Sequence, residues 1–246
     1  ITPQISIRFH FDLYAGVRPV RPIPGVRRIL ADPAAAEMDF VIIRESIEGL
    51  FAPSAPGTLT DDDATETMLI TRANSERLFD FSFRLAERRK AQGHQGKVTC
   101  VDKANVFAAF WFFREIFEKR AEAFPDIIAD AAYVDAFSMQ MVQRPLTLDV
   151  AVTENMYGDI LSDLGAALMG GMGYAPSADI GDDHAVFQPC HGTAPDIAGK
   201  GLANPTAMIL SGAMMLEYLD EKLGAPEATQ AASLVRKAVD AAFAGG

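Results

Sequence analysis

Two aspartates lie four residues apart in the segment Glu154–Asp163, a spacing that could bring their carboxylates together. Apolar residues recur at helical spacing after Gly158, and the run Leu148–Val152 before it is typical of a short buried strand. On a helix, Asp159 and Asp163 would project from one face, where like charges repel by a few tenths of a kcal/mol. A divalent cation such as Mg²⁺ or Mn²⁺ would offset that repulsion, because these ions prefer oxygen ligands. For two aspartates alone, an acidic helix start in contact with water, favoured by the helix dipole, is the more common explanation.

Other charged side chains stand at the ends of predicted strands. Each comes directly after such a strand or two residues later: Arg44, Lys103 and Asp135. In open α/β sheets ligands bind outside the carboxyl ends of strands, so these groups and the two aspartates could share one cleft. Arg8 and Arg18 add two guanidinium groups, and three arginines would suit a di- or tricarboxylic acid through bidentate pairing. Taken singly, each residue could equally be a solvent-exposed charged side chain at the end of a strand.

The elements that must position these residues alternate along the chain. Strand patterns are predicted at 38–43, 97–101, 127–134 and 148–152, and helices at about 71–90, 107–125, 159–169, 204–223 and 227–244. Asn204 and Pro205 are predicted to start their helix as N-cap and first helical residue. Residues 1–13 alternate apolar and polar side chains, and prolines keep residues 14–24 extended. Residues 52–69 should form an exposed loop or arm. This order predicts an α/β fold with a largely parallel sheet.

The composition narrows the class of protein. The 246 residues are 49% hydrophobic and 22% charged, which fits a substantial core in one large or two ordinary domains. A net charge of −11 argues against nucleic-acid and anionic-membrane partners. The sequence has no uninterrupted apolar run of the length that spans a bilayer. Two cysteines form no disulfide framework, so we expect a reduced, cytoplasmic protein.

Six motifs occur in order over most of the chain. They are Asp12–Arg21, Arg44-Glu45 with Glu48-Gly49, Asp102–Val106, Val134-Asp135 with Met139, Asn155–Asp163, and His191–Gly201 with Asn204-Pro205. In this order they resemble the metal-dependent β-decarboxylating dehydrogenases, the isocitrate/isopropylmalate dehydrogenase family, and most of all its isopropylmalate type. The resemblance implies the two-domain fold of that family, which has no classical GxGxxG turn, and none occurs here.

The resemblance also implies a role for each charged residue. The substrate carboxylates would be held by Arg8, Arg18 and Arg44, and Mg²⁺ or Mn²⁺ by Asp135, Asp159 and Asp163. Lys103 would be the base that takes the hydroxyl proton, with Asp135 as its catalytic neighbour, since a lysine beside a cation gives up its own proton more easily. Because sites in this family are shared between subunits, Lys103 and Asp135 would come from the partner in a homodimer.

The cofactor implied by the resemblance is NAD. Its expected binding residues are Asn105, His191, Gly192, Thr193, Ala194, Pro195, Asp196, Ile197 and Asn204. NADP-using isocitrate relatives carry Lys-Tyr where this chain has Asp196-Ile197. A carboxylate there can accept hydrogen bonds from both ribose hydroxyls, which favours NAD.

The domain division expected from the family places 1–14 and 170–246 in the cofactor-binding domain. Residues 15–169 would bind substrate and metal and form the dimer. Family members open with βαβ units before the position of Ile1 and continue beyond that of Gly246, so the cofactor domain is expected to be incomplete at both ends.

Several positions depart from the family pattern. Phe51 stands where the family usually has the Tyr that protonates the enol, and Gln188 where it tends to have Glu. Thr2 and Gln4 differ from the Ser and Asn of isocitrate enzymes, which favours an apolar γ-group as in isopropylmalate. The apolar neighbours expected for that group are Ile1 and Ile5.

The function implied is NAD- and metal-dependent oxidative decarboxylation of a malate-type 2-hydroxy acid, with 3-isopropylmalate as the best guess. Phe51 keeps open a dehydrogenase of tartrate or malate type that releases the keto acid. A catalytically weak regulatory subunit is the alternative from another class. The presence of Lys103 with Asp135, Asp159 and Asp163 argues against it.

Overall fold

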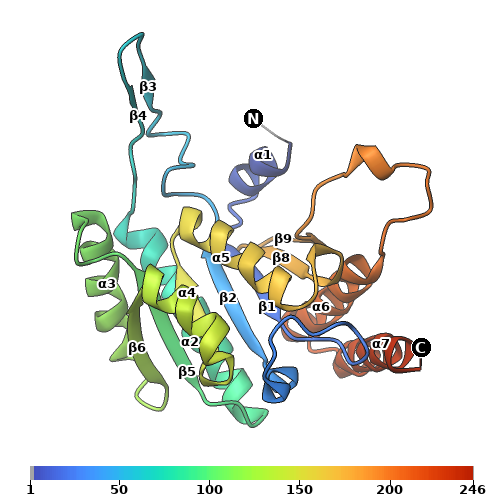
Figure 1. Ribbon diagram of the computed structural model, residues 1–246. Coiled ribbons are helices and arrows are strands. Elements are labelled where there is room, and N and C mark those ends of the chain that lie inside the picture. Colours follow the sequence, from blue (N-terminus) through green and yellow to red (C-terminus); the bar gives the residue numbers. More distant parts are fainter. Residues whose placement is uncertain (1–2, 246) are drawn as a thin grey trace.

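A seven-stranded sheet forms the centre of the protein, seen in a computed structural model that describes residues 3–245 (Figure 1). The strands pair in the order β6-β5-β7-β2-β1-β8-β9. Their bounds are Ala15–Val20 for β1, Phe40–Glu45 for β2, Lys97–Asp102 for β5, Ile128–Tyr133 for β6, Val150–Thr153 for β7, Pro176–Ile180 for β8 and Ala185–Pro189 for β9.

Five of the seven strands run in the same direction. The four strands β6, β5, β7 and β2 pair in parallel, and β1 is antiparallel to both β2 and β8, so that β8 also follows the direction of the first four. The edge strand β9 is antiparallel to β8. The predicted α/β fold with a largely parallel sheet is therefore confirmed. The sheet also joins β1 and β2 to β8 and β9 without interruption.

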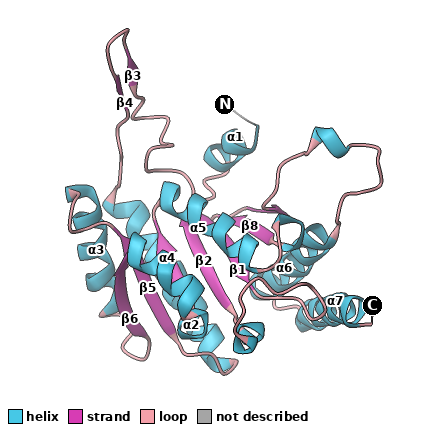
Figure 2. Ribbon diagram, in the orientation of Figure 1, coloured by secondary structure: helices cyan, strands magenta, loops and turns pink. Residues whose placement is uncertain are grey.

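Seven helices surround the sheet in the described residues (Figure 2). They are α1 (Pro3–His10), α2 (Arg72–Ala91), α3 (Ala108–Ala121), α4 (Val134–Gln143), α5 (Asn155–Leu168), α6 (Thr206–Leu223) and α7 (Pro226–Ala244). Short 3-10 helices cover Pro33–Glu37, Pro145–Thr147, Met172–Tyr174 and Pro195–Ile197. None of the helices in residues 3–245 has the length and apolar content that crossing a membrane requires.

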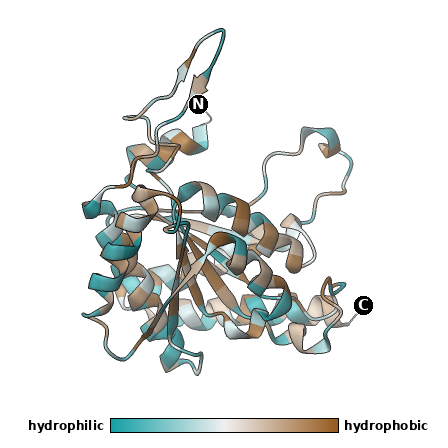
Figure 3. Cartoon of the chain, turned by 60° about the vertical axis from the view of Figure 1, so that its left-hand side comes forward, coloured by the Kyte–Doolittle hydropathy of each residue, from teal (hydrophilic) through white to brown (hydrophobic). Residues whose placement is uncertain are grey.

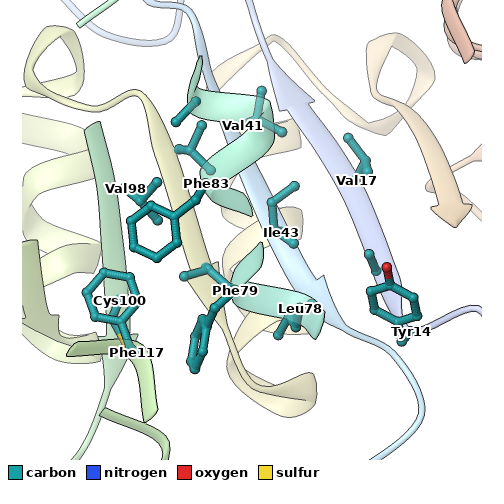
Figure 4. Packing of buried hydrophobic residues seen from close by; sticks show 14 of the residues in the cluster. Tyr14, Val17, Val41, Ile43, Leu78, Phe79, Phe83, Val98, Cys100 and Phe117 are labelled. Atoms are coloured by element: carbon teal, nitrogen blue, oxygen red, sulfur yellow. The ribbon is translucent and has the colours of Figure 1, made fainter. Parts of the chain in front are cut away.

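The core lies on both faces of the sheet because neighbouring residues of a strand point to opposite sides. On β2, Val41 and Ile43 pack with α2, α3 and α6, whereas Phe40 and Ile42 pack with α4 and α5. Figure 4 shows the first face, where Phe79 and Phe83 of α2 lie against the strands. Figure 3 shows the apolar strands enclosed by helices whose outer sides are more polar. The carboxyl ends of the strands are thereby held in a fixed frame.

The arm predicted at 52–69 is confirmed. It carries a small hairpin, formed by β3 (Thr58–Leu59) and β4 (Ala64–Thr65), whose four residues are all exposed. In Figure 1 this hairpin extends well away from the sheet. The arm adds little to the core of its own chain.

Three local details differ from the sequence patterns. The alternating segment at the start forms helix α1, which places Ile5 and Arg8, three apart, on one side. Asp135 lies in the first turn of α4, because β6 ends at Tyr133. Helix α6 begins at Thr206, but Asn204 still serves its start, since its side-chain oxygen accepts the Thr206 N–H at 3.0 Å.

Candidate active site

A cavity of about 230 Å³ opens where α1, α5 and the strands β1, β2, β8 and β9 meet. All three arginines and two of the three aspartates predicted for the site line it. The lining residues are Gln4, Ile5, Arg8, Arg18, Arg44, Phe51, Asp159, Ser162, Asp163, Ser177, Gln188, Pro189 and Cys190. Cationic and anionic groups from segments far apart in the sequence thus share one cavity.

The start of α5 fixes the direction of Asp159 and Asp163. The buried Glu154 caps the helix, since its carboxylate accepts the N–H groups of Met156 at 3.0 Å and Tyr157 at 2.7 Å. At Gly158 the helix touches β2, and a Cβ there would lie 2.6 Å from the Arg44 side chain. This close approach brings the carboxylates of α5 beside the arginine of β2.

Arg44 is held by two contacts from α5. Its Nε donates to the Asn155 side-chain oxygen at 2.9 Å, and its terminal nitrogen donates to Asp159. Burial lowers the pKa of Arg44 to about 10, although the neighbouring Asp159 charge opposes that shift. The group remains cationic at neutral pH, and its guanidinium is oriented before any ligand arrives.

The pair Asp159 and Asp163 has the chemistry of a cation site. Burial and, secondly, the Asp159 charge raise the pKa of Asp163, as expected for two carboxylates one turn apart. Hard divalent cations prefer such oxygen ligands, so the residues present fit Mg²⁺ or Mn²⁺. In the described part of the chain, no three His, Cys, Asp or Glu side chains form a metal-binding group. Further ligands would have to come from a substrate, water or a second subunit.

Arg8 and Arg18 share a carboxylate that the sequence patterns did not single out. Asp179 of β8 accepts from Arg18 at 2.8 Å and from Arg8 at 3.1 Å, and only 1% of the residue is exposed. Burial opposes its ionisation, but the charges of Arg18 and Arg8 outweigh burial and hold the pKa of Asp179 below its usual value. A third negative charge therefore lies next to Arg8 and Arg18, which line the cavity.

Lys103 and Asp135 form an ion pair away from this cavity. Lys103 Nζ donates to Asp135 at 2.5 Å, and this contact lowers the pKa of the exposed Asp135 carboxyl. The turn before them is anchored by buried Asp102, which accepts two hydrogen bonds from Arg114 and one from the Ala104 N–H. Neither Lys103 nor Asp135 lines the cavity of its own chain.

The loop predicted to bind the cofactor projects from the body of the protein after β9 (Figure 1). Gly192 to Asp196 are exposed, and His191, Ile197 and Asn204 are partly buried. Ala194 adopts a left-handed backbone with φ of 43°, which costs a non-glycine residue roughly 1 kcal/mol. Asn105 is not brought to this loop within one chain. It follows β5, and four strands separate β5 from β9, a distance of roughly 24 Å at about 4.8 Å per strand.

Sequence reasoning missed the residues that support the predicted ones. Asp179, Asn155 and Ser162 belong to the site through hydrogen bonds or position, and only the charge of Asp179 within an apolar strand could have drawn attention to it. Of the four N-terminal residues compared with the family pattern, Gln4 and Ile5 line the cavity. Ile1 and Thr2 lie outside the described residues.

Comparisons with known proteins give the chain relatives along its whole length. Residues 2–246 match the family model for isocitrate/isopropylmalate dehydrogenase. The chain is 44% identical over 241 residues to a 3-isopropylmalate/3-methylmalate dehydrogenase of Methanocaldococcus jannaschii, covering 98% of this chain and 68% of the relative. It is 45% identical over 237 residues to an isocitrate/homoisocitrate dehydrogenase of Thermus thermophilus, covering 95% and 65%.

A solved structure supports the same assignment. The isocitrate dehydrogenase of Methylococcus capsulatus superposes with a TM-score of 0.87 at 40% identity, covering 100% of this chain and 69% of that one. The chain thus spans about two thirds of the length of these relatives. It belongs to the isocitrate/isopropylmalate dehydrogenase family, the β-decarboxylating dehydrogenases, and is an oxidoreductase that acts on a CH–OH donor.

Proposed function

We propose that the protein catalyses NAD-dependent oxidative decarboxylation of a malate-type 2-hydroxy acid with the help of Mg²⁺ or Mn²⁺. The observation that supports this most strongly is the cavity in which Arg8, Arg18 and Arg44 face Asp159 and Asp163. Members of the family generally use a divalent metal ion and NAD(P). The named relatives act on 3-isopropylmalate, 3-methylmalate, isocitrate or homoisocitrate, which are all acids of this kind.

The arginines would bind and orient the acid. Their planar guanidinium groups pair with carboxylates, and Arg44 is already fixed by Asn155 and Asp159. Ile5 in the cavity wall offers an apolar contact, which favours a γ-substituent such as the isopropyl group. A cation held by Asp159, Asp163 and Asp135 would favour ionisation of the substrate hydroxyl and later polarise the ketone as CO₂ leaves.

Lys103 would take the hydroxyl proton while NAD accepts the hydride. Because Lys103 and Asp135 do not line the cavity of their own chain, they would be supplied by the partner of a homodimer. Exposed apolar side chains on and near α4 and α5 support such an interface: Met139, Val142, Leu146 and Ile160. Residues 15–169 would then form the substrate, metal and dimer domain, and 1–14 with 170–246 the cofactor domain.

NAD would lie against the loop His191–Ile197 and against Asn204, which follows this loop. Asn105 would contact NAD from the partner subunit. Asp196 is exposed in this loop, where its carboxylate can accept hydrogen bonds from the ribose hydroxyls. We further propose that the protein is cytoplasmic, binds a small hydroxy acid and has neither nucleic acid nor membrane as a partner. The net charge of −11 fits this proposal.

One observation supports a second candidate function. Phe51 lines the cavity with its ring 5.6 Å from the Arg44 guanidinium, and a phenyl ring has no proton to give. If loss of CO₂ is slow without an acid for the enolate that it forms, the enzyme would release the β-keto acid first, as a tartrate- or malate-type dehydrogenase does.

The deciding experiment follows NADH and CO₂ together. The intact protein is given Mn²⁺, NAD and, in turn, isopropylmalate, isocitrate, homoisocitrate, tartrate and malate. NADH and CO₂ in equal amounts with one of these acids support the proposal. NADH without CO₂ selects the second candidate, and tight binding without either product would indicate a regulatory subunit.

A further inference from the structure

We propose that Arg114 is a positioning residue that holds Lys103 and Asp135 in the geometry that the proposed reaction requires. This proposal rests on the proposed function, in which the two residues act as base and metal ligand in the cavity of a partner subunit. Neither of them lines the cavity of its own chain, so the elements that carry them must set their placement.

The ion pair between Lys103 and Asp135 is too weak to fix its own position. Lys103 Nζ donates to Asp135 at 2.5 Å, but 66% of the Asp135 side chain is exposed. Exposed ion pairs contribute little, because water and salt screen the charges and two side chains must be ordered. The placement of both groups therefore depends on the backbone from which they project.

That backbone is anchored through Asp102, the last residue of β5. The buried carboxylate accepts from Arg114 Nε at 2.7 Å, from an Arg114 terminal nitrogen at 2.9 Å and from the Ala104 N–H at 2.8 Å. A guanidinium that donates two hydrogen bonds to one carboxylate fixes its orientation as well as its distance. Arg114 thereby anchors the first side of the turn that contains Lys103.

The second side of this turn leads directly into α3. The Lys103 carbonyl accepts the N–H groups of Val106 at 3.0 Å and of Phe107 at 3.1 Å, and Phe107 is the residue before the helix. Arg114 projects from α3 back to the end of β5. Strand, turn and helix are thus closed by one side chain, with Lys103 in the turn.

The same side chain contacts the end of β6. The Arg114 guanidinium lies 5.0 Å from the centre of the Tyr133 ring, a favourable contact between a cation and an aromatic face. Tyr133 is the last residue of β6 and stands beside Asp102 in the register of the two strands. Asp135 follows in the first turn of α4. One guanidinium therefore touches the final residue of each strand, just before Lys103 and Asp135.

The test is Arg114→Lys, which keeps the positive charge beside Asp102 but loses the planar fork. With saturating Mn²⁺, NAD and the acid that the intact protein oxidises, kcat should fall about tenfold or more, since a small displacement of a reacting group is costly. KM for the acid should stay nearly unchanged, because binding of the acid is assigned to other arginines.

Arg120→Lys is the matched control. Arg120 lies on the same helix and donates two hydrogen bonds to Asp80 of α2, both at 2.8 Å. This variant loses the same kind of ion pair, but its pair does not hold the turn of Lys103. It should therefore keep a normal kcat, which separates positioning of the base from a general loss of stability.

A second variant and a measurement without substrate complete the test. Asp102→Asn keeps an acceptor for the Ala104 N–H but loses the charged pair, and it should lower kcat in the same way. Amide hydrogen exchange over residues 102–107 should become severalfold faster in Arg114→Lys and not in Arg120→Lys.

A normal kcat in both folded variants, an equal fall in Arg120→Lys, or unchanged exchange in Arg114→Lys would overturn the proposal. Failure of the proposed function is separate, because it would show as absent NADH formation by the wild-type protein. The exchange measurement would then still decide whether Arg114 holds the turn.

Discussion

The guanidinium of Arg44 on β2 donates a hydrogen bond to the carboxylate of Asp159 on α5, 115 residues later in the chain. The group proposed to hold substrate and a group proposed to hold the metal ion therefore position each other. The contact depends on Gly158, which lets the helix approach the strand closely. Packing of one helix against the sheet is thus part of the site.

This dependence predicts the effect of Gly158→Ala. The new Cβ would meet the Arg44 side chain at 2.6 Å, so the helix must shift, which should cost ~1–3 kcal/mol of stability and lower activity. Gly212→Ala on α6 is the matched control, because nothing lies within 4 Å of the place that its new Cβ would take. It should stabilise the protein by ~0.5–1 kcal/mol. Denaturant unfolding and initial rates check both; an unchanged Gly158→Ala protein would refute the role of this contact.

Asp159→Asn and Asp163→Asn should each abolish metal-dependent activity without unfolding the protein. Each removes one of the two carboxylates that line the cavity one turn apart. Loss of the partly exposed pair with Arg44 should cost Asp159→Asn no more than ~1 kcal/mol, and Asp163→Asn should be neutral or slightly stabilising.

The measurement is the rate as a function of Mn²⁺ concentration, together with thermal unfolding. Asp240→Asn serves as the control with normal activity, since Asp240 pairs with Arg21 and does not line the cavity. Normal rates at limiting Mn²⁺ in either cavity variant would show that the metal ion is held elsewhere.

Phe51→Tyr should raise decarboxylation relative to hydride transfer. The ring lines the cavity beside Arg44, so a phenolic hydroxyl would stand where a proton is needed. A general acid contributes ~10²- to 10⁴-fold, which makes even a poorly placed one detectable. Phe11→Tyr is the control, since both phenylalanines are 37% exposed but Phe11 does not line the cavity. The delay of CO₂ release behind NADH formation is measured in a single turnover, because the final amounts are expected to be equal. An unchanged delay would mean that another group already protonates the enol.

The protein should prefer NAD to NADP by at least ~100-fold in kcat/KM. The carboxylate of Asp196 would face the 2′-phosphate of NADP, and like charges at such a contact cost several kcal/mol. Replacing Asp196-Ile197 with Lys-Tyr should shrink that preference. Steady-state kinetics with both cofactors measures it, and equal use of NADP by the unmodified protein would disprove the assignment.

The sequence predicted the parts of the site that depend on local order. Helical spacing placed Asp159 and Asp163 on one face, and the strand patterns put Arg44, Lys103 and Asp135 at the carboxyl ends of strands or just beyond. These features follow from residues within about ten positions of one another, where periodicity is informative.

Features that depend on long-range pairing could not be predicted in this way. Asp179 was not predicted because its role depends on the ion pair with Arg18. That residue is 161 positions away in the sequence and is brought close only by the pairing of β1 with β8. The extended segment after Tyr14 was expected, but its antiparallel position between β2 and β8 has no local signal. The first helix was obscured because eight residues are too few to separate helical from alternating periodicity.

The most direct test of the proposed function is a single reaction in which NADH and CO₂ are counted together. The intact protein is incubated with 3-isopropylmalate, NAD and Mn²⁺, with a chelator in a parallel sample. We expect one CO₂ for each NADH, and neither product when the metal ion is removed. NADH without CO₂, or equal rates with and without the chelator, would contradict the proposed metal-dependent oxidative decarboxylation.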